Sequence, residues 1–360
     1  MDLLGGNFVG IDLGTSASAV AWVDRDGTPS AIKNADGQDV TPSEVLLADE
    51  GVFVGARSDG GAQLERGQVV EAVKPQLGRD DALAVYENKQ LTPEFMSALI
   101  LKKLKQDAER RIGEVTDAVL TVPGCFSDKQ RERARDAGRI AGLNVVTLLQ
   151  DSIAITLYDA WRRREWNLGG LSPIERTILV FDLGGGTFDV SVLRRRSSNI
   201  RILATAGDVR LGGRLWTERL VDNVAQRLAD HRLDDSRKHA DKREQLTREC
   251  EQAKCRLSTV AETAIRIRGV DDVALTRSDF QRMTADLLRR TRVITRRVLQ
   301  IADVDSDQLD AIVLSGAACC MPAVAQMLEE VCGREVAGDP FPPESVAIGA
   351  AVYSKILGIK

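Results

Sequence analysis

The chain has 360 residues, 43% of them hydrophobic and 28% charged, a balance typical of a globular protein with well-buried cores. Its 49 lysines and arginines nearly match its 53 aspartates and glutamates, so the net charge of −4 does not favour a nucleic-acid-binding protein. No apolar run approaches the roughly 18 residues of a membrane span, and the first residues do not resemble a signal peptide. We therefore expect a cytoplasmic protein that binds neither nucleic acid nor membrane.

The six cysteines lack the spacing of a disulfide framework, and two histidines are too few to make a zinc site a good interpretation. We therefore expect free thiols in a reducing compartment. Cys319 and Cys320 are adjacent in the sequence. We interpret them as small packing residues, with a redox-sensitive pair as the alternative.

The first predicted element is a hairpin over residues 8–22, in which two apolar strands flank the turn Asp12-Leu13-Gly14-Thr15-Ser16. Strands at 41–47 and 52–55 then begin a small inserted subdomain, which contains Lys74. Taken alone, Lys74 is typical of a solvated surface lysine.

Thr92, Pro93 and Glu94 predict the start of a helix that ends at Gly113. After a buried strand at 118–123, a capping box at Ser127 predicts a second helix, which ends at Gly142.

A strand at 145–149 brings Asp151 to its C-terminal end, where open α/β sheets bind ligands. On local grounds an N-cap role of Asp151 for a helix at 153–163 is an equally good interpretation. The polar residues 162–176, which include glycine and proline, predict an exposed loop.

A second glycine hairpin occupies residues 177–193. Residues 184–186 are all glycine, so the backbone can take positive φ and its N–H groups can approach an anion. Asp182 and Asp189 flank the turn, where a hydrated divalent cation would need them, and Thr187 adds a hydroxyl. One such motif could be an ordinary hairpin. Two of them, one in each half of the chain, indicate a duplicated fold that holds one nucleotide between two lobes.

The rest of the chain alternates strands with charged helices, which indicates α/β layers. Residues 200–206 predict a strand that ends in glycines, and 217–257 predict helix, with a solvated polar face at 232–247. A hairpin is expected at 262–275 about Gly269, followed by a helix that Ser278 caps and that runs to about 302. Its arginine pairs suggest a solvated face rather than an RNA or lipid site. A strand at 311–314 and two helices, from 322 and at 345–357, complete the chain.

Blocks along nearly the whole sequence resemble the ATPase domain of the seventy-kilodalton heat-shock chaperones (the DnaK type), within the actin and sugar-kinase superfamily. They are "VGIDLGTSASAV", "VLTVPGCFSDKQRERARDAGRIAGLNV", "ILVFDLGGGTFDVSVL", "AGDVRLGG", "CEQAKCRLS" and "ESVAIGAAV".

The resemblance implies an α/β, duplicated actin-like ATPase fold, with two lobes of four subdomains around a central nucleotide cleft. Lobe I would span residues 1–190, with an inserted small subdomain at about 35–117. Lobe II would span 191–360, with an inserted helical subdomain at about 228–306.

The family's motifs also imply roles for matching residues. Lys74, Asp151, Thr187 and Asp182 would be catalytic, and Asp12, Asp182 and Asp189 would hold Mg²⁺ through water. Pro123 and Arg131 align with an interlobe relay. ATP or ADP would be bound by Gly14, Thr15, Ser16, Gly184, Gly185, Gly186, Thr187, Gly212, Gly213, Glu251, Lys254, Ser258, Gly316, Ala317 and Cys320.

Several positions depart from the family's pattern, and three of them are among the residues just named. Asp151 replaces a glutamate and shortens its reach by one methylene, Ala317 replaces a glycine, and Cys320 replaces an arginine that stacks on adenine. Losing that stacking contact is worth about 1–2 kcal/mol of binding. Both inserted subdomains also look short, which puts exchange-factor binding in question.

The function that this resemblance implies is ATP binding and slow Mg²⁺-dependent hydrolysis by the nucleotide-binding domain of a heat-shock-type chaperone. The alternative is a nucleotide-binding regulatory or scaffold protein with little or no ATPase activity, and a metabolite kinase or a filament former is a more distant one. The expected partners are a C-terminal peptide-binding domain that would follow this chain, a J-domain co-chaperone and an exchange factor. The chain itself is expected to be a monomer.

Overall fold

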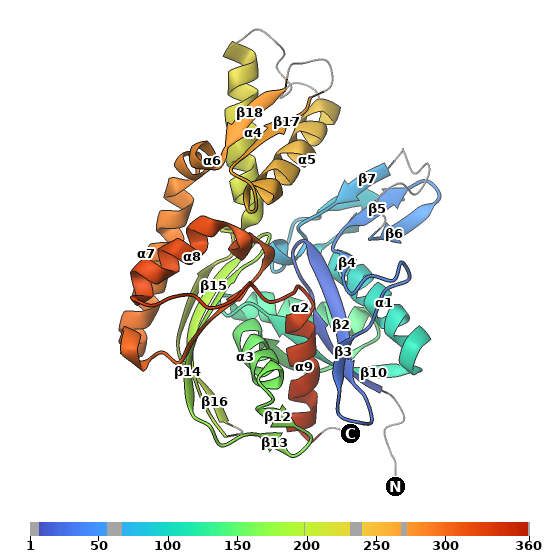
Figure 1. The fold of residues 1–360 in the computed structure, drawn as a ribbon. Helices are drawn as coiled ribbons and strands as arrows, with labels where there is room; N and C mark the ends of the chain where they lie inside the picture. Colours follow the sequence, from blue (N-terminus) through green and yellow to red (C-terminus); the bar gives the residue numbers. More distant parts are fainter. Residues whose placement is uncertain (1–6, 56–66, 198, 231–239, 268–271, 359–360) are drawn as a thin grey trace.

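The structure is a computed structural model that describes residues 7–55, 67–197, 199–230, 240–267 and 272–358. Two twisted β-sheets lie side by side, and smaller groups of strands and helices stand above them (Figure 1). The polar segment expected around 232–247 and the turn expected at Gly269 lie partly or wholly outside the described residues. None of the described helices is long and apolar enough to cross a membrane.

The first sheet has the strand order β11-β10-β1-β2-β3, and β4 pairs with β2 at its side. Strand β1 runs antiparallel to β2 and parallel to β10. The strands are β1 (Asn7–Asp12), β2 (Ala17–Val23), β3 (Pro29–Ala31), β4 (Thr41–Pro42), β10 (Val115–Val122) and β11 (Asn144–Gln150).

The second sheet has the order β16-β15-β14-β19, from β14 (Arg176–Leu183), β15 (Phe188–Arg196), β16 (Asn199–Asp208) and β19 (Ala311–Ser315). Strand β14 is antiparallel to β15 and parallel to β19. This is the pairing of β1 with β2 and β10, so the expected duplication is confirmed.

The C-terminal helix α9 (Ser345–Ile356) joins the two halves, because it packs against β1, β2 and α3 (Asp151–Arg162) of the first half (Figure 1). Glycine permits this close crossing. A Cβ on Gly10 would lie 2.2 Å from the Ala351 nitrogen, and one on Gly349 would lie 1.9 Å from the Ala154 carbonyl oxygen. One buried apolar cluster, which includes Val119, Val180 and Ala350, spans both sheets.

The helix starts at 93 and 128 follow from their caps. Thr92 accepts from the Phe95 N–H at the start of α1 (Pro93–Ile112), and Ser127 forms the expected capping box of α2 (Asp128–Ile140). The cap predicted at Ser278 is wrong, because the Thr276 side chain caps α6 (Arg277–Met283) instead. A break at Thr284 separates α6 from α7 (Ala285–Ala302).

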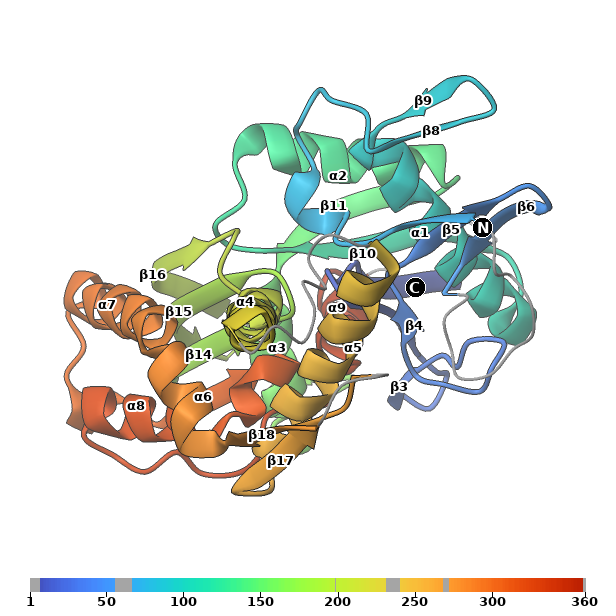
Figure 2. The ribbon, with the colours of Figure 1, turned by 90° about the horizontal axis from the view of Figure 1, so that it is seen from above.

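Two groups of smaller elements stand over the sheets (Figure 1; Figure 2). The group from the first half contains β5 (Val45–Ala48), β6 (Gly51–Val54), β7 (Gly67–Val70), the 3₁₀ helix η1 (Lys74–Gln76), β8 (Ala84–Tyr86) and β9 (Lys89–Leu91). The group from the second half contains α4 (Gly213–Asp230), α5 (Ala240–Leu257), β17 (Glu262–Ile265), β18 (Val273–Thr276) and α6, while α7 and α8 (Pro322–Cys332) flank the second sheet. The lobe and subdomain boundaries expected from the sequence stay predictions.

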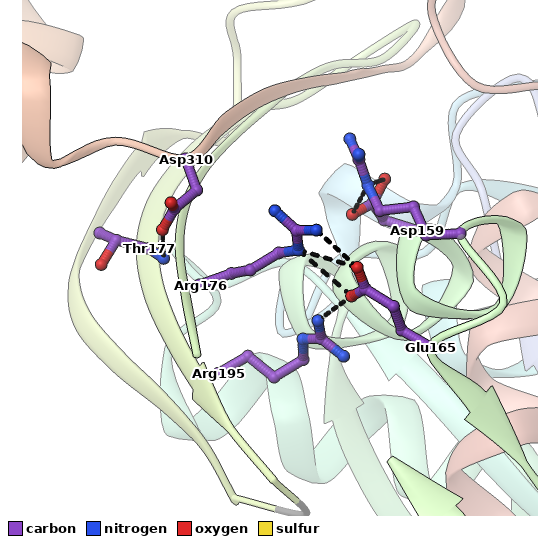
Figure 3. Close-up of polar contacts among 7 residues, drawn as sticks. Asp159, Glu165, Arg176, Thr177, Arg195 and Asp310 are labelled. Carbon is purple, nitrogen blue, oxygen red and sulfur yellow. Dashed lines mark hydrogen bonds and ion pairs between the residues drawn. The ribbon is translucent and has the colours of Figure 1, made fainter. Parts of the chain in front are cut away.

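The exposure predicted at 162–176 is confirmed for residues 162–164, 167–169 and 173–175, but the prediction of a loop is wrong. The segment forms a hairpin of β12 (Trp166–Asn167) and β13 (Gly170–Leu171), and the Trp166 side chain is buried. Glu165 anchors it, because its carboxylate accepts from Arg176 on β14 at 2.6 Å and from Arg195 on β15 (Figure 3). Arg195 is fully buried, so its charge needs this carboxylate.

We expect Glu165→Gln to lower the free energy of unfolding by about 3 kcal/mol, because it leaves the Arg195 charge buried without its carboxylate. Glu175→Gln is the matched control, since Glu175 is half exposed and lies 3.9 Å from Arg194 and 3.8 Å from Arg196. It should change the free energy by less than about 1 kcal/mol. Urea denaturation of the two variants measures both values, and equal losses would contradict a special role for Glu165.

Candidate active site

The two glycine hairpins end in tight turns. The Gly14 N–H donates to Ser18 Oγ at 3.1 Å in the first, and the Gly184 N–H donates to the Thr187 carbonyl oxygen at 3.0 Å in the second. Residues 184–186 do not have positive φ, so that part of the prediction is wrong.

The glycines are needed because the two turns touch. A Cβ on Gly185 would lie 2.0 Å from Ser16 Oγ, and one on Gly186 would lie 2.5 Å from Thr15 Cγ2. The residues that the sequence assigned to phosphate binding in the two halves are thus brought into contact.

The start of α4 joins the two turns, and together they form a surface that we call the glycine floor. The Gly213 N–H donates to the Gly184 carbonyl oxygen at 2.9 Å, and the Arg214 N–H donates to the Gly185 carbonyl oxygen at 2.8 Å. A Cβ on Gly212 would lie 2.5 Å from the Gly186 carbonyl carbon. The three segments form one backbone-lined surface, in which the first N–H groups of α4 are bonded to carbonyl oxygens of the second turn.

Four carboxylates and one lysine gather at this floor. Asp12 ends β1, and Asp182 lies directly opposite Asp189 on the paired strands β14 and β15. Lys74 begins η1, is almost fully buried, and places its Nζ 3.5 Å from Asp151 Oδ2 and 3.7 Å from Asp12 Oδ1. The interpretation of Lys74 as a solvated surface residue is therefore wrong.

Asp151 does not cap α3. Gln150 occupies the N-cap position, and Asp151 is the first residue of the helix. Its Oδ2 contacts Lys74, while its Oδ1 is buried and has no hydrogen-bond partner. A buried carboxylate oxygen without a partner is costly, so this atom is suited to accept a hydrogen bond from a bound water or ligand.

The crowded carboxylates hold protons more tightly than usual. Burial, together with Asp151, raises the pKa of Asp12 to about 6, of Asp182 to about 7 and of Asp189 to about 8. Burial alone would lower the pKa of Lys74, but Asp151, Asp12 and the other carboxylates raise it above its usual value. This excess of negative charge over one ammonium is suited to a divalent cation.

The loop between β10 and α2 reaches the same site. The Cys125 N–H donates to Asp189 Oδ1 at 2.9 Å, and the Cys125 thiol lies 3.5 Å from Asp189 Oδ2. Arg131 holds this loop through the Pro123 and Gly124 carbonyl oxygens, at 3.3 and 3.2 Å. Sequence reasoning missed Cys125, because nothing in its immediate neighbours signals a contact with residue 189.

A second group of predicted residues lies between α4 and α5. Lys254 Nζ donates to the Gly213 carbonyl oxygen at 2.9 Å, to Thr217 Oγ1 at 3.0 Å and to Glu251 Oε2 at 2.7 Å. A cleft of about 690 Å³ is lined by Thr15, Ser16, Gly185, Glu251 and Lys254, among others. It joins the glycine floor to this helix face. Ser258 lines a smaller cavity beside Lys254.

The remaining predicted residues follow β19. Gly316 has φ of 85°, and a Cβ there would lie 2.3 Å from the Leu183 carbonyl oxygen. Ala317 and Cys320 belong to the 3₁₀ helix η4 (Ala317–Cys320) and are exposed. Cys319 is buried, and its thiol contacts the Ser315 carbonyl oxygen at 2.9 Å. The packing interpretation is therefore confirmed for Cys319 and wrong for Cys320.

Among the described residues, no three His, Cys, Asp or Glu side chains are close enough to hold a metal ion directly. All six cysteines are free, as expected.

Taken together, two matched half-sheets and a glycine floor above buried carboxylates define a protein of the actin-like ATPase class. Comparison with known proteins is more specific. The family model described as Hsp70 protein matches residues 8–359. Chaperone protein DnaK of Thermotoga neapolitana is 36% identical over 97% of this chain and 59% of its own length. Chaperone protein dnaK3 of Thermosynechococcus vestitus is 37% identical over 98% of this chain and 55% of its own length.

The chain therefore belongs to the Hsp70 family and corresponds to its nucleotide-binding domain. It spans little more than half the length of these curated relatives. Proteins of this family are ATPases that bind ATP or ADP with magnesium.

Without nucleotide or divalent cation, we expect the free energy of unfolding to fall as pH rises from about 4 to about 8. The folded carboxylates have raised pKa values, so the unfolded chain releases its protons first and becomes favoured as pH rises. Asp182→Asn should make this fall smaller, whereas Asp36→Asn, at an exposed position, should not. Urea denaturation across this pH range measures the free energy of unfolding. An unchanged dependence on pH in Asp182→Asn would contradict the raised pKa of Asp182.

Proposed function

We propose that this chain binds ATP and, with Mg²⁺, hydrolyses it slowly, as the nucleotide-binding domain of a heat-shock-type chaperone. The observation that carries the proposal is the buried Lys74, which contacts Asp12 and Asp151 beneath two glycine turns that touch. Phosphoryl transfer needs positioned charge rather than a covalent nucleophile, and this group supplies it.

The residues at the floor have distinct roles in this proposal. Backbone N–H groups of the two turns bind the phosphates, and Asp12, Asp182 and Asp189 hold Mg²⁺ through water. The bound cation supplies charge neutralisation for the phosphates. The Lys74 ammonium stabilises charge on the γ-phosphate, and the free Oδ1 of Asp151 accepts a hydrogen bond from the attacking water. Thr187, half-buried in the second turn, orients the γ-phosphate.

The part of the site that would bind the nucleobase is built from α4, α5 and η4. Glu251 and Ser258 face the ribose and base, while Lys254 ties α5 to the start of α4 through the Gly213 carbonyl oxygen. The exposed Ala317 and Cys320 offer the base little area for stacking, so most of the affinity comes from the phosphates and the cation.

A nucleotide-binding regulatory or scaffold protein with little ATPase activity is the second candidate. Asp151 favours it, because this shorter side chain already contacts Lys74 at 3.5 Å and has less reach towards a water on the phosphate side.

The whole protein is proposed to include a C-terminal peptide-binding domain, to work in the cytoplasm with a J-domain co-chaperone and an exchange factor, and to be monomeric. The support for the further domain is that the chain covers 59% of the length of the DnaK of Thermotoga neapolitana, and the other parts of the proposal follow from membership of the Hsp70 family.

Calorimetric titration with ATP and ADP in the presence of Mg²⁺, followed by single-turnover hydrolysis, tests the proposal. We expect micromolar binding and slow turnover, on the order of 100-fold or more slower in Lys74→Ala, because the ammonium that stabilises transition-state charge is gone. Lys33→Ala is the matched control, since Lys33 is exposed and contacts Asp39 and the Gly37 carbonyl oxygen near it on the surface.

Binding without turnover in the wild-type chain would support the regulatory candidate. Absence of binding would overturn both, and equal turnover in Lys74→Ala would remove Lys74 from the mechanism.

Cys320→Arg is expected to tighten nucleotide binding about tenfold, because a guanidinium on the exposed end of η4 can stack on the base. The gain should be similar for ATP and ADP, which share the base, and absent for inorganic tripolyphosphate, which lacks it. Calorimetry measures all three. An equal gain for tripolyphosphate would mean that the new charge, rather than stacking, causes the effect.

A further inference from the structure

One ion pair links the two halves of the chain across the nucleotide cleft. Glu71 lies between β7 and η1 in the first half, and Arg214 is the second residue of α4 in the second half. The Arg214 guanidinium donates to Glu71 Oε2 at 2.9 Å, although the two residues are 143 positions apart in the sequence. Both side chains line the cleft of about 690 Å³. The proposed function gives this pair no role.

Arg214 is placed next to the groups that are proposed to bind phosphate. Its backbone N–H donates to the Gly185 carbonyl oxygen at 2.8 Å, which ties the start of α4 to the second glycine turn. Residues of both turns line the same cleft as the Arg214 side chain, namely Thr15, Ser16 and Gly185. At the other end of the pair, Glu71 lies three residues before Lys74. A phosphate group bound at the two turns would therefore share the cleft with the Arg214 guanidinium.

The pair is weak enough for Arg214 to change its partner. The Arg214 side chain is 42% exposed and the Glu71 side chain is 28% exposed, and an ion pair so open to solvent contributes little stability. Lys254, another cation that lines this cleft, differs from Arg214. It is almost fully buried and donates to three oxygen atoms, those of Gly213, Thr217 and Glu251. Lys254 is therefore fixed in place, whereas Arg214 can turn towards a ligand.

A phosphate group is a strong competitor of a carboxylate for a guanidinium. The planar N–H groups of arginine match two phosphate oxygens, and a terminal phosphate carries more negative charge than one carboxylate. The floor beneath it already holds four carboxylates around the single ammonium of Lys74, so an incoming phosphate is repelled unless further cations are present. The carboxylate of Glu71 adds to this repulsion, and the guanidinium of Arg214 offsets it.

We propose that Arg214 binds a phosphate group of the nucleotide and that Glu71 competes with this phosphate for the guanidinium. The Arg214 guanidinium, which pairs with Glu71 in the structure, transfers to the bound phosphate. The inference rests on the proposed function, because it adds a binding residue to the same site. It gives the two residues opposite effects, since Arg214 strengthens nucleotide binding and Glu71 weakens it. A simple latch between the two halves would instead make both residues act in the same direction.

Calorimetric titration with ATP, inorganic tripolyphosphate and adenosine, each in the presence of Mg²⁺, tests the proposal. Arg214→Gln should weaken binding of ATP and of tripolyphosphate about tenfold, because one charge-assisted contact is lost, and should not affect adenosine. Glu71→Gln should tighten binding of both phosphate ligands about threefold, because the guanidinium no longer has to leave a carboxylate. Arg214→Lys keeps the charge without the planar N–H groups and should recover part of the lost affinity.

Arg219→Gln is the matched control. Arg219 lies on the same helix, its side chain is 46% exposed, and it pairs with Asp286 Oδ2 at 2.7 Å, so this variant also removes one exposed ion pair of α4. All three affinities should stay unchanged in Arg219→Gln. Urea denaturation of each variant verifies that the affinities are compared between folded proteins.

Weaker ATP binding in both Arg214→Gln and Glu71→Gln would identify a latch and overturn the proposal. Unchanged ATP affinity in Arg214→Gln, or an equal loss for adenosine, would also overturn it, while the proposed function would stand. If the wild-type chain binds tripolyphosphate but no ATP, the proposed function fails, and the effects of the two variants on tripolyphosphate still decide the role of Arg214. If it binds neither, both proposals fail.

Discussion

The site depends on the burial of four carboxylates around a single ammonium. Asp12, Asp182 and Asp189 lie at the turn ends of their strands, and Asp151 begins a helix, so backbone geometry rather than side-chain flexibility forces them together. Burial and mutual repulsion raise the pKa values of three of them, which shows that the arrangement is costly in the absence of a partner. A buried group of this kind is understandable in a protein that acquires cationic charge when it binds its ligand.

The same duplication that creates this crowding also makes it possible. Each half-sheet contributes one hairpin whose turn would collide with its counterpart if Gly185 or Gly186 had a side chain. Gly10 and Gly349 play the same part on the far side, where α9 crosses β1 and α3. Close backbone approach at both ends fixes the halves at a distance that side chains alone would not allow. Within the first half, Lys74 contacts Asp12 and Asp151, and the approach of the second half adds Asp182 and Asp189 to the same group.

Much of this could be predicted from the sequence, because the signals are local. Alternation of apolar residues gave the hairpins, and the side chains of Thr92 and Ser127 marked their helices correctly. Failures occurred where distant residues decide the outcome. Glu165 turns a polar stretch into an anchored hairpin only because Arg176 and Arg195 approach it from the second sheet. The true cap at Thr276, two residues before Ser278, is set by the end of β18, and Cys125 meets Asp189 through a loop that Arg131 holds.

Of the departures that the resemblance indicates, Asp151 lies at the floor of the site, and Ala317 and Cys320 lie on the other side, in η4. Asp12, Lys74, Asp182 and Asp189 are all in place beneath the glycine turns, whereas the wall formed by α5 and η4 presents Ala317 and two exposed cysteines. Contacts to phosphate and cation are shared by all nucleotides, while stacking and base contacts distinguish them. Under the proposed function, such a site would keep the charge that phosphoryl transfer requires and would lose base-dependent affinity. Occupancy would then respond more to changes in the α5–η4 wall than to changes at the floor.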